Sequence, residues 1–414
     1  MERVILHSDI NSCYASIEHV LHPEYAGRPL AVGGSEAERH GIILAKDELA
    51  KRCGVKTGMA LWQARQLCPG LTILPPRMEV YLDFARRAQE IYGEYTNLRE
   101  PFGMDESWLD LTGCHGVSSG AAAAMEIRRR IKQELGVTVS VGVSWNKVFA
   151  KLGSDYKKPD AVTCISPDNY RDIVWPLPVR DLLYVGRATE SRLRAVGIRS
   201  IGDLARTDPE LLWRKLGKMG YVLHSSANGL DASPVHPAEL PIQVKSVSHS
   251  TTAHRDLVCD EDVRVILAAL TERVAARLRD GGLRCRLITL SVRGGATLAW
   301  RSHQLKLDHA TDITREIFLT GLSLFRQLHR WPAPIRSLGL AAGALESVDA
   351  PEQLDLFSWA DTRRQKQLDA AMDGLRKKYG VPCVRRGVSD NDLYSTNHPP
   401  TLTAFDKLGQ ITSA

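Results

Sequence analysis

The sequence predicts an α+β protein of several domains, and three observations lead to that prediction. The chain has 414 residues, more than one compact domain usually contains. In the first 165 residues, short apolar runs alternate with helical patterns, which is typical of a ferredoxin-like sheet backed by helices. Residues 234–243 contain three prolines among polar residues and read as a linker, and a basic segment follows them.

Hydrophobic patterning gives the individual elements in order. Apolar residues at 81, 84, 88 and 91 have helical spacing and predict an amphipathic helix over 78–95. The other expected helices cover 12–20, 47–52, 60–67, 121–135, 146–156, 260–280 and 363–379. The expected strands cover 3–9, 29–32, 42–44, the run after Asp105, 137–143 and 283–293.

Charge narrows the classes of partner. The net charge is +6, and residues 244–345 account for all of it, with 15 Lys and Arg against 9 Asp and Glu. A basic module attached to a neutral body indicates a polyanion as partner, although an ordinary solvated basic face is the alternative.

Cysteine usage and hydropathy bear on the compartment. The eight cysteines are scattered and form no Cys-x-x-Cys pair, which argues against a zinc site and against a disulfide framework. The N-terminus does not read as a signal peptide, and no run reaches the ~18 apolar residues of a membrane helix. We therefore expect a cytoplasmic protein that does not act at a membrane.

Carboxylates stand at the ends of two expected strands. Asp105 and Glu106 come directly before the run Ser107–Leu111, and Asp9 ends the apolar run that begins at Val4. Three carboxylates from two strand ends are the usual ligand set for two divalent metals in phosphoryl transfer. For Asp105 and Glu106 alone, a solvated turn is the alternative.

A second feature predicts a phosphate contact. The stretch 176–189 leads through Gly186 and Ala188 into a helix that begins near Glu190. A helix, a tight turn and a second helix with outward-facing N-terminal amides form a cradle for a phosphate.

Five motifs, taken in order, resemble those of Y-family DNA polymerases of the DNA polymerase IV type, the translesion enzymes. They cover residues 7–18 (HSDINSCYASIE), 54–59 (GVKTGM), 104–110 (MDESWLD), 141–147 (VGVSWNK) and 245–252 (KSVSHSTT). The resemblance runs from residue 1 to about residue 346.

The resemblance implies an α+β multidomain, right-hand polymerase that adds dNTPs to a primer 3′-hydroxyl under the direction of a template. Its parts would be a ferredoxin-like palm (1–10 and 76–165), small fingers (11–75), a helix-hairpin-helix thumb (166–233), a linker (234–243), an α/β little finger (244–345) and a C-terminal tail (346–414). It also implies two Mg²⁺ ions, primer–template DNA and dNTP as partners, and a monomer.

The resemblance further implies roles for individual residues. The catalytic carboxylates are Asp9, Asp105 and Glu106, which bind the metals together with the carbonyl of Ile10. Nucleotide binding falls on Ser12, Cys13, Tyr14, Lys51 and Lys158, with Tyr14 as the steric gate against a 2′-hydroxyl. DNA binding falls on Gly186, Ala188, Lys245, Ser246, Arg284 and Arg286.

Residues 353–357 (QLDLF) resemble the bacterial sliding-clamp-binding pentapeptide. Leu356 and Phe357 would fill an apolar pocket of the clamp while Gln353 and Leu354 complete the contact. The resemblance therefore adds a sliding clamp to the expected partners.

Two positions depart from the family pattern. Asn11 stands where the family often has a second acid, and Glu48 stands where it usually has a tyrosine that binds the γ-phosphate. Glu48 leaves open a catalytically weak, polymerase-derived DNA-binding scaffold that the clamp recruits. A metal-dependent nuclease or nucleotidyl cyclase is a third reading, and the hairpin and the basic module argue against it.

Overall fold

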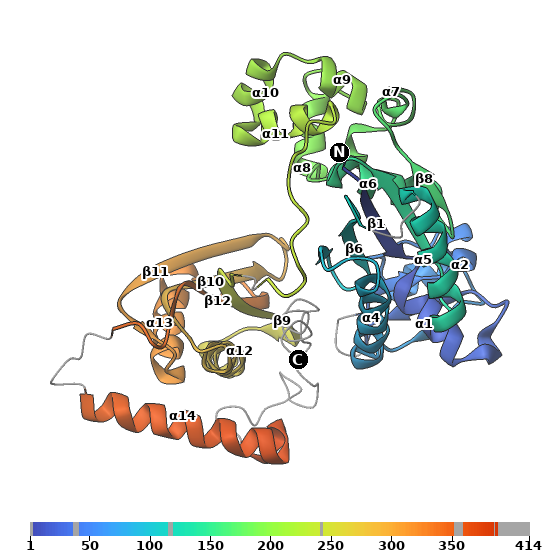
Figure 1. Cartoon of the computed structure of the whole chain (residues 1–414). Helices are drawn as coiled ribbons and strands as arrows, with labels where there is room; N and C mark the ends of the chain where they lie inside the picture. Colours follow the sequence, from blue (N-terminus) through green and yellow to red (C-terminus); the bar gives the residue numbers. More distant parts are fainter. Residues whose placement is uncertain are drawn as a thin grey trace. The chain divides into compact units, whose positions relative to one another are not determined.

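The computed structural model describes residues 3–35, 41–114, 119–240, 243–351, 359–384 and 386–387. The described chain divides into two compact units near residue 241 (Figure 1). None of the described helices combines the length and the apolarity needed to cross a lipid bilayer.

The centre of the first unit is a five-stranded sheet in the order β5-β6-β1-β7-β8. Its strands are β1 (Ile5–Ile10), β5 (Arg99–Pro101), β6 (Glu106–Asp110), β7 (Val139–Ser144) and β8 (Val162–Cys164). β1 is antiparallel to both neighbours, and all six of its residues are buried. The expected strands at 3–9, after Asp105 and at 137–143 are thus confirmed.

Helices cover both faces of this sheet. α4 (Met78–Gly93) and α5 (Gly120–Leu135) pack on the face that carries Leu6 and Leu109. α6 (Lys147–Tyr156) covers the other face, where Ile5 and Trp108 are buried. A Cβ on Gly142 would lie 1.8 Å from the Ala150 carbonyl oxygen, so the glycine lets α6 approach β7 closely.

A smaller sheet in the order β3-β2-β4 stands beside α1. It consists of β2 (Leu30–Gly33), β3 (Ile43–Lys46) and β4 (Thr72–Leu74), while α1 spans Cys13–Leu21 and is followed by the 3₁₀ turn Pro23–Tyr25. α2 (Glu48–Arg52) and α3 (Leu61–Leu67) share a small apolar core with this sheet. Asp47 caps α2 by accepting the amide of Ala50 at 2.7 Å, so the predicted helix starts where expected.

Short helices complete the first unit. They are α7 (Tyr170–Ile173), the 3₁₀ turn Val179–Asp181, α8 (Arg187–Arg194), α9 (Ile201–Arg206), α10 (Pro209–Leu216) and α11 (Lys218–Ala227). The 3₁₀ turn comes shortly before Gly186, and α8 begins at Arg187, three residues before the expected start of that helix near Glu190. Ser200 and Asp203 form a capping box at α9, which fixes the start of that helix.

The second unit is a four-stranded antiparallel sheet with helices on one face (Figure 1). The strands β9 (Ser246–Leu257), β10 (Leu283–Gly294), β11 (Trp300–Thr311) and β12 (Ile335–Ser347) lie in the order β11-β10-β12-β9. α12 (Asp260–Asp280) and α13 (Thr314–Leu328) pack on Ile288, Leu290 and Leu340. α14 (Trp359–Tyr379) and the 3₁₀ turn Val381–Cys383 follow.

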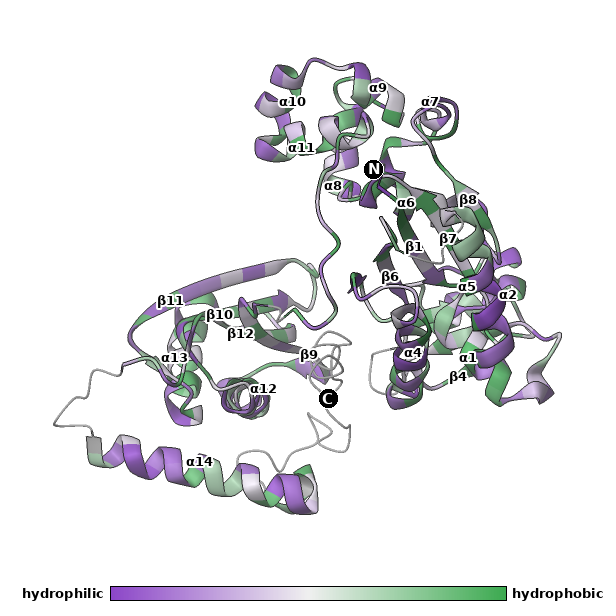
Figure 2. Ribbon diagram, in the orientation of Figure 1, coloured by the Kyte–Doolittle hydropathy of each residue, from purple (hydrophilic) through white to green (hydrophobic). Residues whose placement is uncertain are grey.

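The two faces of this second sheet differ in polarity. In Figure 2 the sheet and its helices alternate between hydrophobic and hydrophilic residues. The face away from α12 and α13 carries small or polar residues in cross-strand rows, such as Ser250, Gly339, Ser291 and Ser302. Arg293 and Lys306 lie on the same face, opposite Trp300 and Leu287, so this open face combines small and polar residues with basic ones.

Candidate active site

One polar pocket of about 380 Å³ in the first unit collects the predicted metal and nucleotide residues. Its walls come from the junction of β1 and α1, from β3 and α2, from the bend before β6 and from the segment after α6. The residues that line it and were predicted from sequence are Asp9, Ile10, Ser12, Cys13, Tyr14, Lys51, Asp105, Glu106 and Lys158. All nine predicted positions therefore meet at one site.

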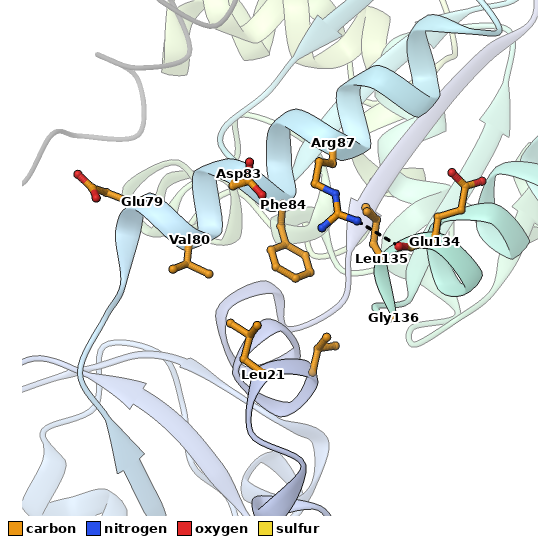
Figure 3. A pocket seen from close by; sticks show the side chains of 10 residues that line it. Leu21, Glu79, Val80, Asp83, Phe84, Arg87, Glu134, Leu135 and Gly136 are labelled. Atoms are coloured by element: carbon orange, nitrogen blue, oxygen red, sulfur yellow. Dashed lines mark hydrogen bonds between the residues drawn. The ribbon is translucent and has the colours of Figure 1, made fainter.

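A larger hollow of about 770 Å³ lies elsewhere on the same unit (Figure 3). Its walls include Leu21, Phe84 and Leu135, with Arg87 donating to the Glu134 carbonyl oxygen at 3.2 Å. None of the predicted site residues lines it. The smaller, polar pocket is thus the candidate active site.

Strand register places the carboxylates. Asp9 at the end of β1 pairs with Glu106 at the start of β6, so the two side chains share one face of the sheet. The amide of Ile10 donates to the Asp105 carbonyl oxygen at 2.9 Å, which holds the bend that carries Asp105 against the end of β1. The expected turn-to-strand junction brings all three carboxylates to the pocket.

Lysines approach two of the carboxylates. Lys158 Nζ lies 2.7 Å from Asp9 Oδ2 and 2.7 Å from Asp155 Oδ1. Lys151, on α6, forms an ion pair with Glu106. His7 Nε2 lies 3.3 Å from Glu106 Oε2, and His7 Nδ1 lies 2.8 Å from Ser154 Oγ. The sequence analysis named neither Lys151 nor His7 as a site residue, although His7 begins the first motif and Lys151 lies one helical turn after Lys147, the end of the fourth.

The buried carboxylates lack full compensation of their charge. Burial raises the pKa of Asp9 to about 6 in spite of Lys158, and burial with repulsion from Asp9 and Glu106 raises the pKa of Asp105 to about 6. Among the described residues, no three His, Cys, Asp or Glu side chains already converge as a metal cage. Oxygen donors with unbalanced negative charge nevertheless fit hard divalent cations, since such cations would supply the missing positive charge.

The start of α1 faces the same pocket. Ser12 precedes the helix with φ 47° and ψ 42°, a left-handed conformation that is rare for a residue other than glycine. Its side chain does not cap the helix, so the amides of the first turn keep their capacity to bind an anion.

The ring of Tyr14 is held by a chain of buried contacts. It stacks on Tyr81 with ring centroids 4.4 Å apart and an interplanar angle of 11°. Tyr81 donates to Glu18 Oε1 at 2.5 Å, and Arg77 donates to the same oxygen at 3.0 Å. Sequence reasoning missed this support because Tyr81 lies on α4 and Arg77 directly before it, and only the fold brings them to Tyr14 and Glu18 of α1.

Asn11 has a structural role. Its Nδ2 donates to Ser140 Oγ at 2.8 Å, and its Oδ1 accepts from Thr138 Oγ1 at 3.0 Å and from the Asp160 amide at 2.9 Å. A carboxylate could not donate to Ser140. The amide therefore joins β1 to β7 and to the segment that carries Lys158.

Glu48 lines the pocket and is paired. Lys51 Nζ lies 3.2 Å from Glu48 Oε1, one helical turn away on α2. Lys51 is 53 % exposed, so the ion pair lies at the mouth of the pocket and is partly screened by solvent.

The predicted DNA contacts have different surroundings. Gly186 caps α8 and Ala188 lies in its first turn, both exposed. In the second unit, Lys245 and Ser246 are exposed, and Ser246 lies on the open face of the sheet. Arg286 is half-buried and pairs with Glu346 at 3.1 Å.

Arg284 requires a correction. It is 3 % exposed, and its guanidinium donates to the carbonyl oxygens of Ala350 at 2.7 Å and of Ser347 at 3.3 Å. A buried guanidinium that holds the end of β12 cannot reach a phosphate from that position. The sequence prediction failed because a strand rich in arginine does not show which of its faces each arginine takes. The predicted clamp peptide, with Gln353, Leu354, Leu356 and Phe357, lies outside the described residues.

Family models and curated relatives that match this chain all point to one family of proteins. The model of the impB/mucB/samB family matches residues 8–155, and the model of its C-terminal domain matches residues 244–356. The chain is 46 % identical over 391 residues to DNA polymerase IV of Acetivibrio thermocellus, covering 94 % of this chain and 98 % of the relative. It is 35 % identical over 390 residues to DNA polymerase IV 1 of Bacillus subtilis, covering 94 % and 93 %.

Solved structures agree on the fold. A Y-family DNA polymerase chimera of Dbh and Dpo4 superposes with a TM-score of 0.70 at 24 % identity, over 82 % of this chain and 98 % of the other. DinB from Sulfolobus solfataricus gives a TM-score of 0.53 at 25 % identity over the same shares.

The chain belongs to the impB/mucB/samB family, the Y-family DNA polymerases of the DNA polymerase IV type. It is a DNA-directed DNA polymerase of translesion synthesis with the right-hand α+β fold, as the sequence predicted. The alternative of a catalytically weak scaffold is not favoured by these relatives.

Proposed function

We propose that this polymerase joins a dNTP to a primer 3′-hydroxyl at the polar pocket, with Asp9, Asp105 and Glu106 and the carbonyl of Ile10 as ligands of two Mg²⁺ ions. The observation that supports this best is the meeting of the three carboxylates, two of them with raised pKa, in one pocket with Lys158 and the start of α1. Bound divalent cations would supply Lewis-acid activation of the hydroxyl and neutralise the triphosphate.

The chain's own residues would place the nucleotide. Cys13 and Tyr14 line the pocket at the start of α1, and their backbone amides would suit a triphosphate because helix N-termini favour anions. Lys158 lines the same pocket, paired with Asp9, and would pair with phosphate oxygens. The carboxylates fixed by the pairing of β1 and β6 then orient the hydroxyl for attack.

Tyr14 would act as the gate for the sugar. Its ring stacks on Tyr81, whose hydroxyl donates to Glu18, and Arg77 donates to the same carboxylate. A ring fixed in this way cannot change its rotamer without losing the stacking contact, so a 2′-hydroxyl on the incoming sugar would clash with it.

Primer–template DNA would contact two surfaces. In the first unit, the exposed turn at Gly186 and Ala188 offers amides to a phosphate. In the second, the open face of the sheet offers Ser246, Arg293 and Lys306 among small residues, so a backbone can come close without reading sequence. We leave Arg284 out of this surface because it is buried.

The remaining inferences concern the protein partner, the oligomeric state and the compartment. We infer that residues 353–357 bind the sliding clamp and that the enzyme acts as a monomer. All eight cysteines are free thiols, which suits the reducing cytoplasm.

Primer extension tests the proposal directly. The full-length wild-type chain with Mg²⁺ and four dNTPs should copy the template, whereas Glu106→Gln should lower the rate more than about tenfold, a change of ~1.4 kcal/mol in the barrier. Both proteins should bind DNA equally. A variant rate within tenfold of wild type would contradict the metal assignment, and failure of the wild type to extend any primer would contradict the function.

A further inference from the structure

The wall of the pocket that β3, α2 and Thr57 form, which we call the fingers side, carries two lysines that differ in their partners. Three lysines line the pocket. Lys158 is paired with Asp9 at 2.7 Å, and Lys51 is paired with Glu48 at 3.2 Å. Lys46 donates to the neutral hydroxyl of Thr57 at 3.2 Å, and the described residues include no carboxylate in an ion pair with it.

Lys46 also differs from Lys51 in its support. It is the last residue of β3 and pairs with Ala31 of β2, so its backbone belongs to a sheet. Its side chain is only partly exposed. Burial and then the nearby Lys51 lower the pKa of Lys46, whereas Glu48 acts in the opposite direction, so the charge of the ammonium is only partly compensated. An arriving phosphate would relieve that deficit.

We propose that Lys46, held by Thr57, is the fingers-side cation for the dNTP triphosphate, and that Glu48 keeps Lys51 out of that role. This inference rests on the proposed function and assigns a binding residue to the same site. Lys46, Lys51 and Thr57 lie on the same wall as Glu48, so a triphosphate that enters there meets the repulsion of Glu48 and needs a compensating cation.

The geometry explains why Lys46 suits this task better than Lys51. Lys51 is on the exposed side of a five-residue helix and would have to leave Glu48 to reach a phosphate. Lys46 would give up only one hydrogen bond to a hydroxyl. Freeing Lys51 leaves the Glu48 carboxylate unpaired beside the triphosphate, whereas freeing Lys46 leaves only a neutral hydroxyl.

The test compares single-nucleotide incorporation by the full-length wild type, Lys46→Ala, Lys46→Arg and the control Lys56→Ala. Lys56 is an exposed lysine of the same region that does not line the pocket. Lys46→Ala should raise KM for dNTP about tenfold, the loss of one charge-assisted hydrogen bond, with a smaller change in kcat. Lys46→Arg should stay within about threefold of wild type because the charge remains.

A binding measurement gives a readout apart from turnover. On a dideoxy-terminated primer, the dNTP concentration that stabilises the ternary complex in a mobility-shift assay should rise about tenfold for Lys46→Ala and not for Lys56→Ala. A wild type that extends primers, with Lys46→Ala within about twofold of it in both assays, would overturn the inference and leave the proposed function intact. A loss confined to kcat would overturn it as well.

A coupled variant tests the part assigned to Glu48. Glu48→Gln removes the carboxylate that holds Lys51, so Lys51 can then replace Lys46. In that background Lys46→Ala should cost about threefold in KM, where it costs about tenfold in the parent. Equal costs in both backgrounds would show that Glu48 does not withhold Lys51, and would overturn that half of the inference.

Discussion

Replacing Asp105 by Asn should stabilise this polymerase while abolishing its activity. Burial, and then repulsion from Asp9 and Glu106, raises the pKa of Asp105 from 3.8 to about 6. A rise of that size corresponds to about 3 kcal/mol of unfavourable free energy when the carboxyl ionises in the folded chain. Asparagine has nearly the same shape and no charge, so the variant should gain up to about 3 kcal/mol at pH 7.

The sign of the pH dependence follows from the same shift. Between pH 3.8 and about 6 the folded state binds more protons at Asp105 than the unfolded state does. Stability of the wild type therefore falls as the pH rises through this window, and the whole cost is present above it. The advantage of Asp105→Asn should vanish near pH 4 and be largest above pH 6.

Thermal unfolding in the presence of a chelator, from pH 4 to pH 8, measures this difference without bound cations. At pH 7 the melting temperature of Asp105→Asn should exceed that of the wild type by roughly 5–10 °C. The control Asp168→Asn changes an exposed carboxylate and should shift stability by less than about 0.5 kcal/mol. A variant that melts at or below the wild-type temperature at pH 7 would refute the account in which burial and repulsion destabilise the ionised Asp105.

Three further outcomes are expected. Tyr14→Ala should raise ribonucleotide relative to deoxynucleotide incorporation by orders of magnitude, each tenfold being ~1.4 kcal/mol, whereas Tyr14→Phe keeps the ratio; an unchanged ratio would leave Tyr14 a packing residue only. Replacing both Leu356 and Phe357 by Ala should remove stimulation by a sliding clamp without loss of clamp-free activity, and equal stimulation would reject the peptide as the contact. Arg293→Ala with Lys306→Ala should reduce the slope of log K against log salt by about 1.8, and an unchanged slope would place the DNA contacts elsewhere.

The pattern of apolar residues predicted the strands that carry the carboxylates because a run of apolar residues is enough to mark a buried strand. Apolar runs that end in Asp9 or begin after Asp105 are buried strands, and their pairing brings the acids together. The edge strand β11 was missed for the opposite reason. Residues 300–306 are exposed on both faces, so no alternation marks them, and their conformation depends on pairing with β10.

Side-chain partners across elements were also beyond prediction. The sequence placed Tyr14 on a helix, but the stacking with Tyr81 depends on how α4 crosses α1. The same holds for Lys151, which reaches Glu106 only because α6 covers the face of the sheet that carries the acid. Motif positions identify which residues share a site, and packing decides which of them touch.

The two departures from the family pattern are compensated within the fold in different ways. At Asn11 the amide donates one hydrogen bond and accepts two, so a neutral residue fastens β1 beside Asp9 where a third buried acid would add repulsion to two carboxyls of already raised pKa. At Glu48 the compensation is electrostatic and partial, since the ion pair with Lys51 is exposed to solvent. Because that pairing occupies Lys51, positive charge on the fingers side must come from a residue fixed by the sheet, and the end of β3 places Lys46 there.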